Sequence, residues 1–433
     1  MRIWSQAKEM AALTPDARNR YVDFLRALSI LFVVIGHWLI ATAYVVDGEM
    51  IPGHLLEAKP EFHWLTWLFQ VMPIFFMVGG YSNAVSLESA KRKGTDYAGW
   101  LAGRLNRLVA PLLTVLFAWA LISVVLLLFG VSIDTVQFVS RSCLIPTWFL
   151  AIYIMVVILA PAVYRLWQRF GFLSFWAFTA MAALTDVAFF AADLQWLGWT
   201  NYFWVWLAVH QLGFAWRDGR TGGPMALLGI AAIAFVAMYF LIFKGPYPLA
   251  MVSSPGEGVS NTLPPKITLL VLGVVQFGLL LSLEKPMRAA LSGLRLWSGT
   301  VLINSMIMTV YLWHMSVLAA VVAILYYTGG FGLGVEPGTT DWWLLRPVWI
   351  GGLLVLLLPF SLLLSPFERR GRSPDAPVPG AARQIAGAAI LCLGLAVIAM
   401  YGYGGGPSPW LTAVAFALVV IGAWLGGLLP RTN

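Results

Sequence analysis

The chain has 433 residues, of which 60% are hydrophobic and only 11% are charged. Soluble domains carry about 25% charged residues, so this composition excludes a soluble globular protein and indicates a polytopic membrane protein. The net charge of +8 could suggest nucleic-acid binding, but the basic residues form no patch and lie between apolar runs, as they do in cytoplasmic loops.

Apolar runs of about 20 residues are long enough to cross a bilayer as helices. Twelve such runs occur, at residues 22–45, 64–87, 105–130, 147–165, 172–191, 199–216, 224–244, 266–284, 300–326, 343–366, 384–402 and 409–428. The sequence therefore predicts an all-α transmembrane bundle of about twelve helices, with ten in a core and two in a C-terminal hairpin. The predicted parts are a cytoplasmic segment 1–20, a membrane domain 21–367, a cytoplasmic linker 368–383 and the hairpin 384–433.

The basic residues also predict the orientation of these helices. With the N-terminus inside, the inner segments hold 21 Lys and Arg residues, the first helix holds Arg26, and the outer loops hold five: Lys59, Arg141, Lys244, Lys266 and Arg346. This positive-inside bias places both termini in the cytoplasm. Together with the abundance of arginine and the lack of an organelle signal, it favours a bacterial inner membrane.

The first predicted helix carries three ionisable residues, Asp23, Arg26 and His37. Ionisable side chains inside a membrane are costly, so they suggest function. Eleven residues separate Arg26 from His37, which is three helical turns and about 20°, so both lie on one face with Asp23 nearby. A neutral imidazole there could accept a proton from a hydroxyl group. The alternatives are a structural histidine and an anchoring Arg26–Asp23 pair.

Arg104 and Arg107 lie where the third apolar run begins, on its cytoplasmic side. Residues three apart on a helix are neighbours, and guanidinium groups bind phosphates bidentately, so the pair could hold a phosphate. A helix N-terminus would add to this preference for anions. Taken alone, the pair is better explained by cytoplasmic topology, because basic residues accumulate on that side of a membrane protein.

Other polar residues are candidates of lower rank. Asp186, His210, Tyr311 and His314 lie in later predicted helices, and each could serve only as a hydrogen bond between helices. In the second predicted helix, Pro73 predicts a kink, and Gly79-Gly80 allows a close helix contact. His54 and His63 lie in the loop before that helix and are expected to be exposed to solvent. Cys143 and Cys392 predict neither a disulfide nor a metal site.

Five of these motifs, in this order, resemble bacterial acyltransferase family 3, which comprises integral-membrane O-acyltransferases that modify carbohydrates. They are Arg26 to His37, Phe75-Phe76-Met77-Val78-Gly79-Gly80, Arg104-Leu105-Asn106-Arg107, Trp148-Phe149-Leu150 and Tyr311-Leu312-Trp313-His314. Gly79 departs from the family's usual Ser. Many members also carry an extracytoplasmic SGNH domain, whereas this chain ends in two more helices, so a separate extracytoplasmic partner is one way to complete the transfer.

The resemblance implies transfer of an acyl group, expected to be acetyl, from cytosolic acyl-CoA to a hydroxyl of an envelope carbohydrate or glycolipid. Arg104 and Arg107 would hold the CoA phosphates, and His37 would be the base. Arg26, with Asp23 beside it, would position the pantetheine end or orient His37. The acceptor or a proton relay would involve Asp186, His210, Tyr311 and His314. No metal and no nucleic acid is expected.

Two other classes of protein are compatible with parts of the sequence. A transporter or flippase for a sugar, polyol or lipid-linked glycan would also have many helices with intramembrane charges. Neither half of the chain repeats the other, and a facilitator has no reason to carry the RxxR pair with the Arg-to-His spacing. The buried charges disfavour a purely structural or signalling protein.

Overall fold

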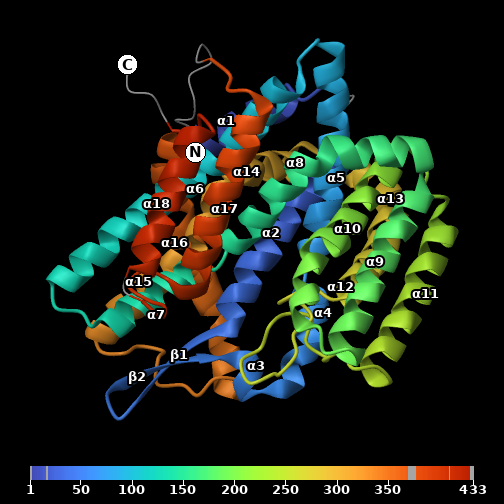
Figure 1. Ribbon diagram of the computed structural model, residues 1–433. Helices are drawn as coiled ribbons and strands as arrows, with labels where there is room; N and C mark the ends of the chain where they lie inside the picture. The colour runs from blue at the N-terminus through green and yellow to red at the C-terminus, as the bar shows by residue number, and fades with distance from the viewer. Residues whose placement is uncertain (1, 16–17, 369–376, 409, 430–433) are drawn as a thin grey trace. The chain divides into compact units, whose positions relative to one another are not determined.

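The computed structural model describes residues 2–15, 18–368, 377–408 and 410–429. Within these ranges the regular structure is helical apart from one two-stranded sheet, and every predicted apolar run contains a helix (Figure 1). Nine helices in the described ranges are long and apolar enough to span a membrane, or ten if the bent pair α12–α13 is one span. The all-α polytopic bundle is therefore confirmed.

Two of the predicted spans are shorter than their apolar runs suggest. Helix α10 (Asn201–Arg217) has 17 residues and α18 (Leu411–Leu425) has 15. At 1.5 Å per residue they are about 26 and 23 Å long, less than the roughly 30 Å of a bilayer core. A third, α12 (Ile267–Ser282), is followed by α13 (Glu284–Ala290) at a bend of 54°.

The chain forms two compact units, of which the first comprises residues 1–42, 52–86 and 160–307. Its helix α2 (Arg20–Ile40) packs against α14 (Leu294–Ser305), which also contacts α1 (Arg2–Ala12). Helices α9 (Phe172–Ala191), α10, α11 (Pro224–Phe243) and α12 lie side by side (Figure 1). Its shorter elements are α3 (Leu55–Ala58), η1 (Pro60–Trp64), α4 (Leu65–Phe69) and η2 (Gln195–Thr200).

Helix α5 (Met72–Arg92) contributes its first part to this unit and meets α10 through two glycines. A Cβ atom on Gly80 would lie 1.9 Å from the carbonyl oxygen of His210, and one on Gly213 would lie 2.0 Å from that of Met77. The predicted close helix contact is therefore confirmed at Gly80. The kink predicted at Pro73 takes the form of a break in the second span, because α4 ends at Phe69 and α5 begins at Met72. Pro73 therefore lies in a first helical turn, where proline is tolerated.

The second unit comprises residues 43–51, 87–159 and 308–433. Helix α6 (Tyr97–Leu128) contacts α7 (Ile133–Leu144), α16 (Thr340–Glu368) and α17 (Ala381–Tyr401). Helix α8 (Thr147–Phe170) contributes its first half, and α15 (Ile307–Tyr327) nearly its whole length. Helix α17 also packs tightly on α18, where a Cβ atom on Gly422 would lie 2.5 Å from the carbonyl oxygen of Gly387. Of the predicted linker 368–383, residues 369–376 lie outside the described residues.

The first apolar run is not one helix to residue 45, as predicted. Helix α2 ends at Ile40, and β1 (Ala41–Val46) and β2 (Glu49–His54) form a hairpin. Asp47 and Gly48 form its turn, both with positive φ, which is the geometry that an Asp-Gly hairpin turn requires. β-Branched and aromatic residues in β1 explain why an apolar segment forms a strand here.

Candidate functional site

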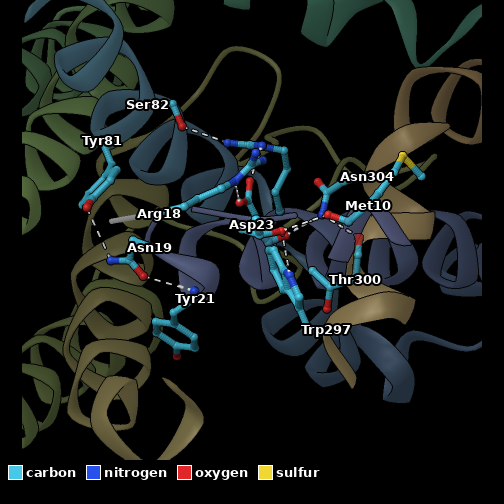
Figure 2. A network of polar contacts seen from close by, with 12 residues as sticks. Met10, Arg18, Asn19, Tyr21, Asp23, Tyr81, Ser82, Trp297, Thr300 and Asn304 are labelled. Atoms are coloured by element: carbon cyan, nitrogen blue, oxygen red, sulfur yellow. Dashed lines mark hydrogen bonds and ion pairs between the residues drawn. The ribbon is translucent and has the colours of Figure 1, made fainter. Parts of the chain in front are cut away.

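Asp23 lies in the first turn of α2 and is only 5% exposed. One carboxylate oxygen accepts a hydrogen bond from Nε of Arg18 at 2.5 Å, and the other accepts one from Nη1 of Arg26 at 3.0 Å. Figure 2 shows Arg18 and Asp23 at the centre of this network. Two guanidinium groups therefore compensate a carboxylate that would be costly to bury alone.

Arg26 joins α2 to α5. While Nη1 contacts Asp23, Nη2 donates to Oγ of Ser82 at 2.8 Å. The planar guanidinium thus uses two donors at once, a geometry that a lysine ammonium cannot reproduce. Neither Ser82 nor Arg18 was predicted as a site residue, although Ser82 belongs to the polar triplet Tyr81-Ser82-Asn83 in the middle of α5.

Further contacts fix the start of α2 to its neighbours (Figure 2). Asn19, the N-cap of α2, accepts a hydrogen bond at Oδ1 from the backbone N–H of Tyr21. Its Nδ2 donates to Oε1 of Glu284 at 3.1 Å and lies 3.4 Å from the hydroxyl of Tyr81. Asn304 on α14 donates to the carbonyl oxygen of Asp23 at 2.9 Å. The beginning of α2 is therefore held by α5, α13 and α14 through polar contacts.

His37 lies in the last turn of the same unbroken helix. The predicted alignment with Arg26 therefore holds along α2, at a separation of about 16 Å along the axis by the helical rise. Since the guanidinium group of Arg26 is bonded to Asp23 and Ser82, toward the helix start, Arg26 does not orient His37 by direct contact. That part of the prediction is corrected.

The predicted exposure of His63 is also wrong, because the residue is only 8% exposed. Its Nε2 lies 2.9 Å from the carbonyl oxygen of Leu56, and its Nδ1 lies 3.5 Å from Oε1 of Glu257. His54 is partly buried. Glu257 lies 194 positions after His63, so no local pattern could have indicated this contact.

Asp186 is buried in α9, and its carboxylate accepts three hydrogen bonds. The donors are Nδ2 of Asn201 at 2.8 Å, the hydroxyl of Tyr247 at 3.1 Å and the backbone N–H of Ile267 at 2.8 Å. Ile267 opens α12, so the carboxylate also satisfies a free N–H at a helix start. The buried Lys266 lies nearby with Nζ 3.8 Å from the centre of the Phe189 ring. These contacts supply the partners that a carboxylate inside a membrane needs.

The remaining candidates from later helices are buried. His210 lies with Nε2 3.0 Å from Nδ2 of Asn83, at the contact of α5 with α10. In the second unit, the hydroxyl of Tyr311 donates to the carbonyl oxygen of Pro146 at 2.7 Å, and Nδ1 of His314 lies 2.7 Å from the carbonyl oxygen of Tyr311. Each of these contacts stabilises packing, and a role toward a substrate stays a prediction.

Arg104 and Arg107 lie further inside α6 than predicted. The helix begins at Tyr97, so Arg104 is about two turns from its start, and Asp96 already caps the free N–H of Gly99. The favourable field of a helix N-terminus fades within one turn, so it does not assist the pair. Arg104 is partly exposed and Arg107 is exposed.

No group of three or more His, Cys, Asp or Glu side chains in the described ranges is arranged to hold a metal ion. Cys143 and Cys392 are both buried and free.

Comparison with known proteins gives one match. Residues 19–366 match the family model described as an acyltransferase domain. This range includes α2 with Asp23, Arg26 and His37, and it also includes the RxxR pair. No curated protein and no solved structure matches the chain.

Proposed function

The chain belongs to the family of membrane acyltransferases, acyltransferase family 3, and we propose that it moves an acetyl group from cytosolic acetyl-CoA to a hydroxyl of an envelope carbohydrate or glycolipid. It is a multi-pass membrane protein, and we place it in the bacterial inner membrane with both termini in the cytoplasm. The observation that carries the proposal is the single helix α2, which holds Arg26 paired at its start and His37 three turns later.

In this proposal His37 is the general base. Its imidazole takes the proton from the acceptor hydroxyl as the oxygen attacks the thioester carbonyl carbon. The bond from that carbon to the CoA sulfur breaks, and the proton passes from His37 to the leaving thiolate. The products are the acetyl ester and free CoA, so the protons balance without another reactant.

The donor contacts Arg104 and Arg107. Two guanidinium groups three residues apart on α6 suit the phosphate groups of CoA, which accept hydrogen bonds and carry negative charge. Their exposure and cytoplasmic side support this assignment. Asp186, His210, Tyr311 and His314 are proposed for the acceptor or for proton transfer, and an extracytoplasmic protein could take the product onward.

Asp23 and Arg26 are positioning residues in this scheme. The Asp23 carboxylate holds the guanidinium group of Arg26, and that group joins α2 to α5 through Ser82 and is directed away from His37. Their task is to fix the height and rotation of α2, because a displaced base loses its alignment with the reacting hydroxyl.

The test uses membranes that contain the full-length protein, acetyl-CoA labelled in the acetyl group, and glycan extracted from the envelope of a strain that lacks the protein. Label is expected in the glycan as an ester that mild alkali releases. Membranes from the same strain without the protein provide the control. Absence of protein-dependent label in glycan or glycolipid would contradict the proposal.

A further inference from the structure

The segment between β2 and α4 lies against the last turn of α2, where His37 is found. Helices α3 and α4 both pack on α2 (Figure 1). A Cβ atom on Gly53 would lie 2.8 Å from Oγ1 of Thr42, and one on Gly36 would lie 3.2 Å from the Phe69 ring. His54 follows Gly53 directly, so its backbone is fixed beside the end of α2.

His63 and Glu257 hold this segment in place. The hydroxyl of Thr66 donates to the carbonyl oxygen of His63 at 2.5 Å, while both ring nitrogens of His63 face acceptors. The loop that carries Glu257 is also bonded to α4 and to the residue after it, because Trp67 donates to the carbonyl oxygen of Leu249 and Gln70 to that of Met251. The segment that carries His54 is therefore held by contacts of His63 with Leu56, with α4 and with the Glu257 loop.

His54 itself has a ring nitrogen without a structural role. It occupies the N-cap position of α3 but makes no side-chain capping bond. Its Nδ1 is buried and has no hydrogen-bond partner among the described residues. A buried polar atom left without a partner costs free energy, which points to a ligand that completes it.

The charge of His54 restricts the chemistry of that ligand. Burial, and next to it the charge of His63, lowers the pKa of His54 to about 4. The titratable groups around it are His37 on α2, His63 on η1 and, beyond His63, Glu257 on the loop. His54 is therefore neutral near pH 7, with one donor and one acceptor nitrogen, which matches a hydroxyl group better than a carboxylate or phosphate.

We propose that His54 binds an uncharged, hydroxyl-bearing part of the acceptor beside His37, as a neutral sugar or polyol would present it. This inference rests on the proposed function and adds a residue on the acceptor side. His63 and Glu257 are positioning residues that keep the His54 ring at the end of α2.

The test measures label transfer from acetyl-CoA at graded concentrations of the extracted envelope glycan, and then at graded concentrations of acetyl-CoA. His54→Ala is expected to raise the half-saturating glycan concentration about tenfold, the effect of losing one hydrogen bond in a buried site, and to leave that of acetyl-CoA unchanged. His54→Gln, which keeps an uncharged donor and acceptor, should remain within about threefold of the wild type. Glu57→Gln, an exposed change on α3, is the matched control.

An unchanged glycan requirement in His54→Ala, or an equal rise for glycan and acetyl-CoA, would overturn the inference. If His54→Ala inserts poorly into the membrane, the test relies on His54→Gln. A His54→Gln variant that inserts normally but transfers no label at any glycan concentration would also overturn the inference. Failure of the proposed function and failure of the inference about His54 give different results. A wild type that labels no glycan refutes the proposed function and the inference with it, whereas normal labelling with an unaffected His54→Ala refutes only the inference.

Discussion

The guanidinium group of Arg26 bridges two helices, and the energy of this bridge can be measured. Its Nη2 donates to Ser82 at 2.8 Å, and a hydrogen bond to a charged group contributes about 1.5–3 kcal/mol. Because the Arg26 side chain is 30% exposed, we expect the lower end of that range. Ser82→Ala should therefore lower the free energy of unfolding by about 1.5 kcal/mol.

Arg26→Lys keeps the positive charge near Asp23 but cannot donate in two directions from one plane. It should cost at least as much as Ser82→Ala, and the double variant should cost no more than Arg26→Lys alone. The expected coupling is thus about 1.5 kcal/mol in a double-mutant cycle, measured by denaturant titration of the protein in detergent micelles.

The control is Ser298→Ala on α14, where the hydroxyl is bonded to a carbonyl of its own helix. That change should be additive with Arg26→Lys. Additivity of Ser82→Ala and Arg26→Lys to within about 0.5 kcal/mol would refute the bridge as an energetic link between α2 and α5.

Three further substitutions test the contact of α5 with α10, the donor site on α6 and the buried carboxylate of α9. Gly80→Leu should abolish correctly folded protein, because the new Cβ atom would lie 1.9 Å from a backbone oxygen on α10. The readout is loss of a monodisperse peak in detergent. Gly103→Ala, with open space around the new Cβ atom, should leave that peak unchanged. Replacing Arg104 and Arg107 together by Ala should raise the half-saturating acetyl-CoA concentration at least tenfold, and an unchanged value would exclude them as donor contacts. Asp186→Ala should cost about 3 kcal/mol of unfolding free energy, since three donors lose their acceptor, and wild-type stability would contradict that role.

Hydropathy located the helices because a bilayer imposes one length and one polarity on every span. It did not locate the end of α2, where the apolar run continues into β1. The Asp47-Gly48 dipeptide was the available signal, since it is typical of a hairpin turn. The predicted stripe of Asp23, Arg26 and His37 depended only on helical periodicity and therefore survives in α2.

The contacts of the site were less predictable, because they join residues far apart in the chain. Ser82 lies 56 positions from Arg26, and Glu257 lies 194 from His63. Periodicity places a side chain on a face but does not identify the neighbouring helix. For Asp186 the need for partners was predictable from the cost of a buried carboxylate, but their identity, Tyr247 and the start of α12, required the fold.

The role of His37 as the base in acyl transfer is measured with the His37→Ala variant in membranes supplied with labelled acetyl-CoA and envelope glycan. Removal of a general base typically costs a factor of about 100 to 10,000, so label transfer should fall at least 100-fold while the amount of inserted protein stays the same. Transfer within about threefold of the wild type would exclude His37 as the general base.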